Sequence, residues 1–171
     1  ERQEDAVTAA PRADKLTLLR RAYLDLTGLP PTLDESEAFL ADTAPGSWER
    51  VIDQLLASSH YGERWGRHWL DVARYADSDG YEQDVDRKNA WRYRDYIVNA
   101  FNSDKPYDEF ITEQIAGDEM DEATHESRIA TGFLRAGPRV NFREKDNPER
   151  RWDYLDDVIA TLGRGVLGMT I

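Results

Sequence analysis

Apolar residues recur at steps of three and four along most of this chain, which is the spacing of one face of an α-helix. Leu16, Leu19, Tyr23 and Leu26 form the first such stripe. A short helix is expected next, to about Ala41. Further apolar stripes predict helices within residues 48–56, 61–76, 90–102, 106–115, 129–134 and 148–162.

Capping residues place several helix starts. Asp14 is suited to cap the first helix, and Thr32 followed by Glu35 is a capping-box pattern for the second. Ser47 is expected to cap the third. With these starts and the apolar stripes, the sequence predicts seven or eight helices.

Two stretches lack an apolar period and are expected to be long polar loops. They cover residues 77–89 and 139–148. No window shows the alternation of a half-buried strand. We therefore expect an all-α fold without a significant sheet: a single compact multi-helix domain over residues 14–171, preceded by a flexible lead-in over residues 1–13.

Charge and composition exclude several classes of partner and cofactor. The 171 residues include 34 acidic and 22 basic side chains, for a net charge of −12 at pH 7. An acidic surface repels phosphate backbones, so no nucleic acid partner is expected. No run of about 18 apolar residues predicts a membrane span. The sequence contains no cysteine, which excludes a thioether-linked haem or a thiolate metal site, so no cofactor is expected in this chain.

Residues 58–95 interleave aromatic, basic and acidic side chains more densely than a core or a solvated helix would. Aromatic faces with polar edges suit a sugar or an anionic small molecule. The same residue types also suit a buried polar network, which is the favoured interpretation. The candidate ligand-binding residues are His68, Asp71, Arg74, Tyr75, Tyr81, Asn89, Trp91, Arg92, Tyr93 and Asp95.

The network interpretation makes two structural predictions. At least one Arg–Asp pair should link the helix over 61–76, or the start of the following loop, to the helix over 90–102. His68 should be a hydrogen-bonded structural residue rather than a ligand. Asp71 and Asp95 could alternatively act as general acid and base, although no nucleophile or matched partner accompanies them.

The acidic loop offers a weak metal alternative. Asp77, Asp79, Glu82 and Asp84 could supply oxygen ligands to Ca²⁺. Their order does not fit an EF-hand, and arginines close by in the sequence could neutralise them instead. No metal site is therefore expected.

Four segments carry a family resemblance: RRAYLDLTGLPPT (20–32), LLASSHYGERWGRHWLDVARYADSDGYEQD (55–84), NAWRYRDYIVNAFNSDKPYDEFITEQIAGD (89–118) and ATGFLRAGP (130–138). On these motifs the chain resembles the DUF1549 domain, also called PSCyt2, over roughly residues 14–171. This domain of unknown function is abundant in planctomycetes and related bacteria. The family has no activity that can be assigned to particular residues of this chain.

The resemblance implies an exported protein of the periplasm or cell envelope. Family members often carry a cytochrome c domain upstream and a DUF1553 domain downstream, which would be the partner domains here. In the family, a segment similar to GVLGMTI (165–171) leads into a Cys-x-x-Cys-His haem-attachment sequence. The present chain is therefore expected to be truncated before that sequence, and haem c is expected only in a longer parent protein.

Three functions follow as hypotheses. The first is a non-catalytic module of a cytochrome c-associated protein, which scaffolds or docks an adjacent haem segment for electron transfer. The alternative is a carbohydrate or small-molecule binding module that uses the aromatic and polar belt over residues 65–95. The third is an enzyme domain of unknown reaction. An open cavity beside Trp91 and Tyr81 would favour binding, and a filled network would favour scaffolding.

Overall fold

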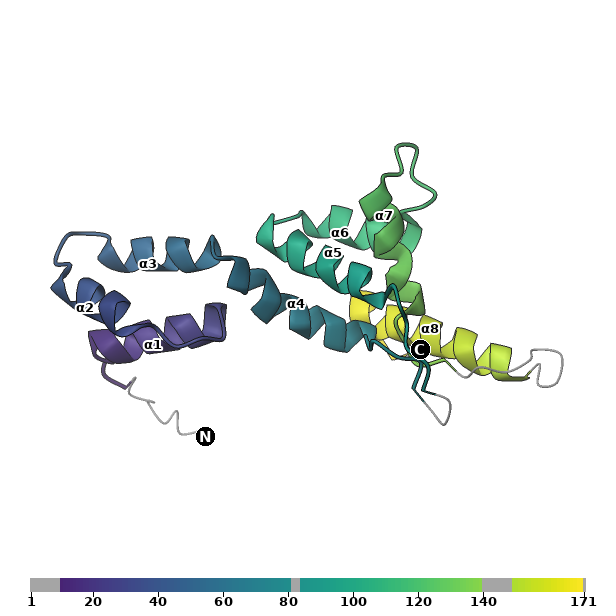
Figure 1. Ribbon diagram of the computed structural model, residues 1–171, viewed down its shortest axis with the longest axis horizontal. Coiled ribbons are helices and arrows are strands. Elements are labelled where there is room, and N and C mark those ends of the chain that lie inside the picture. Colours follow the sequence, from purple (N-terminus) through teal and green to yellow (C-terminus); the bar gives the residue numbers. More distant parts are fainter. Residues whose placement is uncertain (1–9, 81–83, 140–148, 171) are drawn as a thin grey trace, which may run out of the picture.

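The protein, seen in a computed structural model, consists of helices joined by turns and loops (Figure 1). The structure describes residues 10–80, 84–139 and 149–170. These ranges contain no β-strand, only an isolated bridge between Ser78 and Asp86, so the all-α prediction is confirmed. The elements are α1 (Lys15–Leu26), α2 (Leu33–Ala41), α3 (Ser47–Leu56), α4 (Ser59–Ala73), α5 (Ala90–Asn102), α6 (Tyr107–Ala116), α7 (His125–Ala130), the 3-10 helix η1 (Thr131–Arg135) and α8 (Glu149–Leu167).

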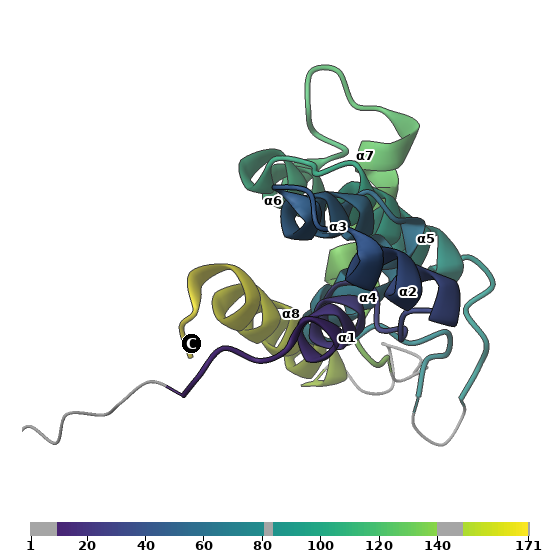
Figure 2. The same cartoon turned by 90° about the vertical axis from the view of Figure 1, so that its left-hand side faces the viewer.

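The helices gather around two hydrophobic clusters. Helices α1, α2 and α3 enclose the smaller cluster, which includes Leu19 and Leu55. The larger cluster includes Ile97, Phe110 and Phe133 and is enclosed by the elements from α4 onward. Figure 1 shows the first three helices at one end of the molecule and α5 to α8 at the other, with α4 running between them. In the end-on view of Figure 2, α8 lies apart from α6 and α7.

The predicted caps are confirmed for α1 and α2. The Asp14 carboxylate accepts from the Thr17 amide at 2.9 Å. Thr32 and Glu35 form the reciprocal capping box, in which the Glu35 carboxylate accepts from the Thr32 amide at 2.7 Å. The prediction for Ser47 is wrong: Ser47 is the first helical residue, and Gly46 precedes it in the left-handed conformation at φ 77°. A glycine at that angle turns the chain into α3 without a side-chain cap.

Helix α4 ends at Ala73, three residues before the predicted end. Arg74 takes a left-handed conformation at φ 58°, and the amides of Arg74 and Tyr75 donate to the carbonyls of Asp71 and Leu70. This is a Schellman-type helix end. It is unusual because arginine occupies the position that normally favours glycine, and the apolar periodicity carried no sign of it.

The α7–η1 segment also departs from the predicted helix over 129–134. Helix α7 begins earlier, at His125, because Thr124 and Ser127 cap each other's backbone amides. The chain then tightens into η1 at Thr131. Residues 1–9 of the predicted lead-in and residues 140–148 of the second predicted loop lie outside the described residues.

Two glycines of α4 let it approach α5 closely. A Cβ on Gly62 would lie 2.3 Å from the Val98 carbonyl oxygen, and the Gly62 amide donates to the Asn102 side chain at 2.7 Å. One turn later, a Cβ on Gly66 would lie 3.2 Å from Ile97 Cγ2. The backbone contact at Gly62 cannot be relieved by turning a side chain, whereas the Ile97 methyl group can move.

The two glycines therefore predict different costs for the same substitution. Gly62→Ala should separate α4 from α5 and lower the free energy of unfolding by about 2–3 kcal/mol, as over-packing does. Its melting temperature should fall by about 4–12 °C for a chain of this size. Gly66→Ala gains up to about 1 kcal/mol of helix propensity against a mild contact and should melt within about 2 °C of wild type. Equal melting temperatures for the two variants would contradict the difference between the two helix contacts.

A polar network fills the space between α4, α5 and α6. The buried Gln114 side-chain oxygen accepts from the Trp69 indole N–H and from the Tyr93 hydroxyl, both at 2.7 Å. The Gln114 amide group donates to the Phe110 carbonyl oxygen at 3.0 Å. Each of these buried polar groups is therefore paired, which is the condition for a stable polar core.

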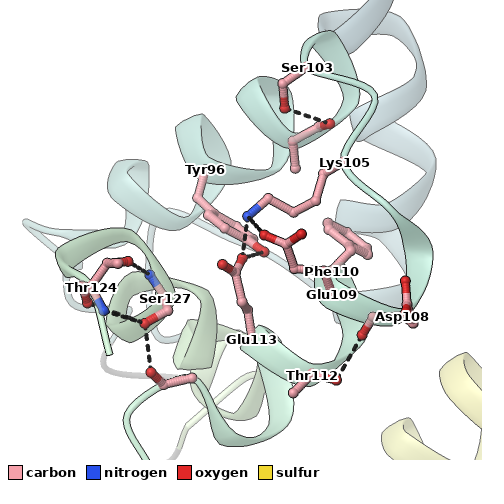
Figure 3. A network of polar contacts seen from close by, with 12 residues as sticks. Tyr96, Ser103, Lys105, Asp108, Glu109, Phe110, Thr112, Glu113, Thr124 and Ser127 are labelled. Atoms are coloured by element: carbon pink, nitrogen blue, oxygen red, sulfur yellow. Dashed lines mark hydrogen bonds and ion pairs between the residues drawn. The ribbon is translucent and has the colours of Figure 1, made fainter. Parts of the chain in front are cut away.

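The second half of the network contains a buried ion pair (Figure 3). Glu113 accepts from the Tyr96 hydroxyl and from the Lys105 amino group, both at 2.6 Å. The same amino group contacts Glu109 at 3.3 Å. Burial opposes the charge on Lys105, but the hydrogen bonds and negative charges of the two glutamates outweigh it, so the pKa of Lys105 is raised.

The pKa values of four tyrosines are raised, as that of Lys105 is. Burial raises the pKa of Tyr23 to about 12. Burial also raises the pKa of Tyr75, Tyr93 and Tyr96, and hydrogen bonds to Asp77 and Glu113 add to it for Tyr75 and Tyr96. A group with a raised folded-state pKa holds its proton more tightly in the folded state than in the unfolded state.

The protein should consequently lose stability in alkali. Raised pKa values contribute stability that is complete below the unfolded-state values of about 10 and is lost as the pH rises through the folded-state values. The midpoint of urea unfolding should therefore fall steeply between about pH 10 and pH 12. Phenolate absorbance should show some tyrosines ionising only when the chain unfolds. A midpoint that stays constant from about pH 8 to pH 11 would contradict these shifts.

Candidate functional site

A cavity of about 350 Å³ lies between the start of α5 and the α7–η1 segment. Arg87, Arg92, Arg128 and Arg135 line it, and we call it the arginine pocket. No acidic side chain lines it among the described residues. The remaining lining residues are Tyr75, Asn89, Ala90, Tyr93, Ile129, Thr131, Gly132 and Ala136.

Local helix geometry brings these side chains together. Arg128 and Arg135 are seven residues apart, about two turns of helix, and therefore share a side of the α7–η1 segment. Arg92 comes from the first turn of α5. A Cβ on Gly132 would lie 3.1 Å from the Tyr93 Cβ, so the absence of a side chain lets η1 approach α5 closely.

Arg87 stabilises the wall of the pocket, because its guanidinium is hydrogen-bonded to the protein rather than available to a ligand. Its Nε donates to Asp79 at 2.6 Å, and its terminal nitrogens donate to the carbonyls of Ala136 at 2.9 Å and Gly137 at 2.7 Å. These carbonyls end η1 and would otherwise lack partners. Arg87 thus ties the loop before α5 to the end of η1, and its guanidinium is fully engaged.

The other three arginines of the pocket are exposed and have no carboxylate partner within the described part of the chain. The Arg92 guanidinium lies 5.5 Å from the centre of the Trp91 ring, a cation–π contact that leaves its N–H donors available. Arg128 and Arg135 have no side-chain hydrogen bond to another described residue. Three exposed arginines therefore line one cavity in a protein whose net charge is −12.

The phenols that line the pocket are hydrogen-bonded and neutral. Tyr75 donates to Asp77, and Tyr93 donates to Gln114. Because burial raises the pKa of Tyr75 and of Tyr93, both stay protonated at neutral pH. Neither phenol is thus an activated nucleophile. The arrangement offers positive charge, hydrogen-bond donors and aromatic surface, which are the elements of anion recognition.

Four of the ten candidate residues meet at this cavity: Tyr75, Asn89, Arg92 and Tyr93. Trp91 joins them through its contact with Arg92. Tyr81 lies outside the described residues. The remaining four candidates, His68, Asp71, Arg74 and Asp95, do not line the pocket.

His68 and Asp71 are exposed on α4. The His68 ring packs against Trp65 with their centres 5.3 Å apart, and it has no hydrogen bond to another described residue. The expectation that His68 is hydrogen-bonded is therefore wrong. Gly66 and Ala73 are buried on the side of α4 that meets the neighbouring helices, whereas position 68 is exposed.

The predicted Arg–Asp link from α4 or the loop start to α5 is absent from the described residues. Arg74 instead pairs with Asp157 of α8. Asp95 pairs with its neighbour Arg94 at 3.0 Å. The left-handed turn at Arg74 places this arginine beside α8, a contact that spans 83 residues and leaves no trace in local spacing.

Eight lining residues are not among the candidates that the sequence suggests. Three of them are polar residues of the α7–η1 segment: Arg128, Thr131 and Arg135. They lie outside the dense belt over residues 65–95, which is the feature that marked the candidate residues. The seven-residue spacing of Arg128 and Arg135 is the signal that could have found them. This spacing places both arginines on the same side of the helix, and no carboxylate lies between them on that side.

The acidic loop is held by internal hydrogen bonds. The Asp79 carboxylate accepts from Arg87, and the Asp84 carboxylate accepts from the Gly80 amide at 2.9 Å. The hydrogen bonds from Ser78 and Gly80 lower the pKa of Asp84. Glu82 lies outside the described residues. In the part of the chain that the structure describes, no three His, Asp or Glu side chains gather to hold a metal ion.

Over the described ranges, no helix combines the length and apolar character that crossing a membrane requires.

Comparisons with other proteins place the chain in a family without a described activity. No curated protein and no solved structure matches the chain. A family model matches residues 1–171, and the chain belongs to that family, PSCyt2, described as a protein of unknown function (DUF1549).

Proposed function

We propose that this domain is a non-catalytic binding module that holds an anionic small molecule in the arginine pocket. The observation that carries the proposal is the convergence of Arg92, Arg128 and Arg135, without carboxylate partners among the described residues, on one cavity of about 350 Å³. Like charges that share a cavity repel one another, and a bound anion removes this cost.

The ligand chemistry follows from the donor set. Guanidinium groups recognise carboxylate, phosphate and sulfate through paired N–H donors. Asn89 adds an amide, and Tyr75 adds aromatic surface that suits a ring. An acidic sugar would use all three features, and it is the carbohydrate that best fits this site.

The lining residues support binding rather than catalysis. General acid–base chemistry needs a group that titrates near the working pH within reach of the substrate. The described lining residues include no histidine or carboxylate, and the phenols of Tyr75 and Tyr93 have raised pKa values. The site thus favours a role in recognition.

Thermal unfolding in sodium sulfate, sodium phosphate or sodium glucuronate tests the proposal, with chloride at equal ionic strength as the reference. For a dissociation constant of about 1 mM, about 20 mM ligand adds about 1.8 kcal/mol, which raises the melting temperature by about 4–7 °C. Glucuronate should act more strongly than acetate if the aromatic surface contributes, and glucose should have little effect.

The double variant Arg128→Gln/Arg135→Gln should lose this shift. Without a ligand it should melt at or above the wild-type temperature, because the substitution removes like charges that face one another. Arg20→Gln/Arg21→Gln is the matched control, since both residues are exposed on α1 and have no ion pair within the described residues. An equal anion effect in both double variants would contradict the proposed site.

A second role is favoured by a different surface. Trp152, Leu155 and Ile159 form an apolar stripe on α8, and they are 66%, 37% and 50% exposed. We propose that this stripe packs against further domains of a longer, exported cytochrome c-associated protein. The domain would then scaffold an adjacent haem c segment for electron transfer, in the periplasm or cell envelope. The two roles are compatible because they use different residues.

The fluorescence of Trp152 tests the scaffolding role. The signal lost in Trp152→Phe isolates this indole from the rest of the five tryptophans. Acrylamide should quench that signal readily in the present chain and several-fold less in a longer protein that includes the cytochrome c and DUF1553 domains. The longer protein should also show a Soret band that survives denaturation. Equal quenching in the two proteins, or haem that is extracted by denaturant, would contradict this role.

A further inference from the structure

A second cavity, of about 190 Å³, lies toward the opposite end of α5 from the arginine pocket. Tyr93 lines the first cavity and Phe101 lines the second, so the two are separated by about 12 Å along the helix axis. The second cavity is lined mainly by aromatic rings, and we call it the aromatic pocket. Its lining residues are Tyr61, Trp69, Ala100, Phe101, Asp104, Lys105, Tyr107 and Phe110.

Asp104 stands out among these residues because of its backbone. It has a positive φ of 49°, and the amides of Asp104 and Lys105 donate to the carbonyls of Phe101 and Ala100. This pattern is a Schellman helix end, where glycine is the usual residue and any side chain is less favourable. Aspartate is one of the few residues other than glycine that tolerate this conformation, and here it belongs to the lining of the aromatic pocket.

The Asp104 carboxylate is also available. It has no ion pair or side-chain hydrogen bond with another described residue, and it is exposed. The nearby Lys105 does not neutralise it, because the Lys105 amino group lies between Glu113 at 2.6 Å and Glu109 at 3.3 Å (Figure 3). Taken together, these four charged side chains carry a net negative charge at this end of α5.

We propose that the aromatic pocket binds a small organic cation of the alkylammonium class. Its methyl or methylene groups would lie against the rings of Tyr61, Phe101 and Tyr107, whose faces attract cations. Its charge would lie beside Asp104. A sugar would need several directed hydrogen bonds. The unpartnered polar groups of the described lining are the Asp104 carboxylate and the hydroxyls of Tyr61 and Tyr107, and only the carboxylate is charged. The acidic protein, with a net charge of −12, also draws cations toward its surface.

Calorimetric titration of the chain with tetramethylammonium chloride tests the site, with sodium chloride at equal ionic strength as the reference. Wild type should bind tetramethylammonium in the millimolar range. Asp104→Asn preserves the shape and tolerates the left-handed conformation, so it should weaken binding at least tenfold while leaving the melting temperature unchanged. Asp104→Gly should weaken binding similarly and should melt at a higher temperature, because glycine relieves the backbone strain.

Two control variants show whether binding depends on this particular carboxylate or on the overall negative charge of the protein. Asp108→Asn removes the same charge four residues away, outside the lining residues, and should leave the affinity within about twofold of wild type. Arg128→Gln/Arg135→Gln should bind tetramethylammonium normally, so the arginine pocket can fail without this site failing. Unchanged binding in Asp104→Asn, a response no larger than that to sodium, or tighter binding of glucose than of tetramethylammonium would each overturn the proposal.

Discussion

The close contact between α4 and α5 is the constraint on which the rest of the larger cluster depends. Gly62 and Gly66 remove the side chains that would hold these helices apart, and the Gly62 amide is satisfied by Asn102. With α5 held against α4 at this depth, Tyr93 and Tyr96 reach Gln114 and Glu113 of α6. The two cavities then lie toward the two ends of α5.

Local patterns predicted most of the helices and little of the site. The apolar stripes and the caps at Asp14 and Thr32 depend on neighbours within one or two turns, which a sequence displays directly. The end of α4 at Arg74 and the ion pair with Asp157 depend on contacts between distant segments. The spacing of Arg128 and Arg135 could have placed them on one helix side, but their pocket depends on η1 packing against Tyr93, which local spacing does not display.

The two described residues other than glycine that have a positive φ occupy equivalent positions at helix ends. Arg74 and Asp104 are the residues other than glycine with positive φ in the described ranges, and each ends a helix of the central pair. A glycine would be less strained at either position. At Arg74 the side chain is used, since it joins α4 to α8 and the Gly137 backbone lies against its guanidinium. At Asp104 the side chain tolerates the conformation better than an arginine does, and its carboxylate has no ion pair or hydrogen bond with another described residue.

In the proposed function, the acidic surface and the arginine pocket would together determine which anions can bind. At physiological ionic strength, charges are screened beyond about 8 Å, so a small anion inside the cavity responds mainly to Arg92, Arg128 and Arg135. A nucleic acid or another large polyanion would also span the surrounding surface, including the exposed Asp84 and Asp86 of the neighbouring loop, and would be repelled there. A net charge of −12 around the proposed anion site would thus favour small anions over large ones.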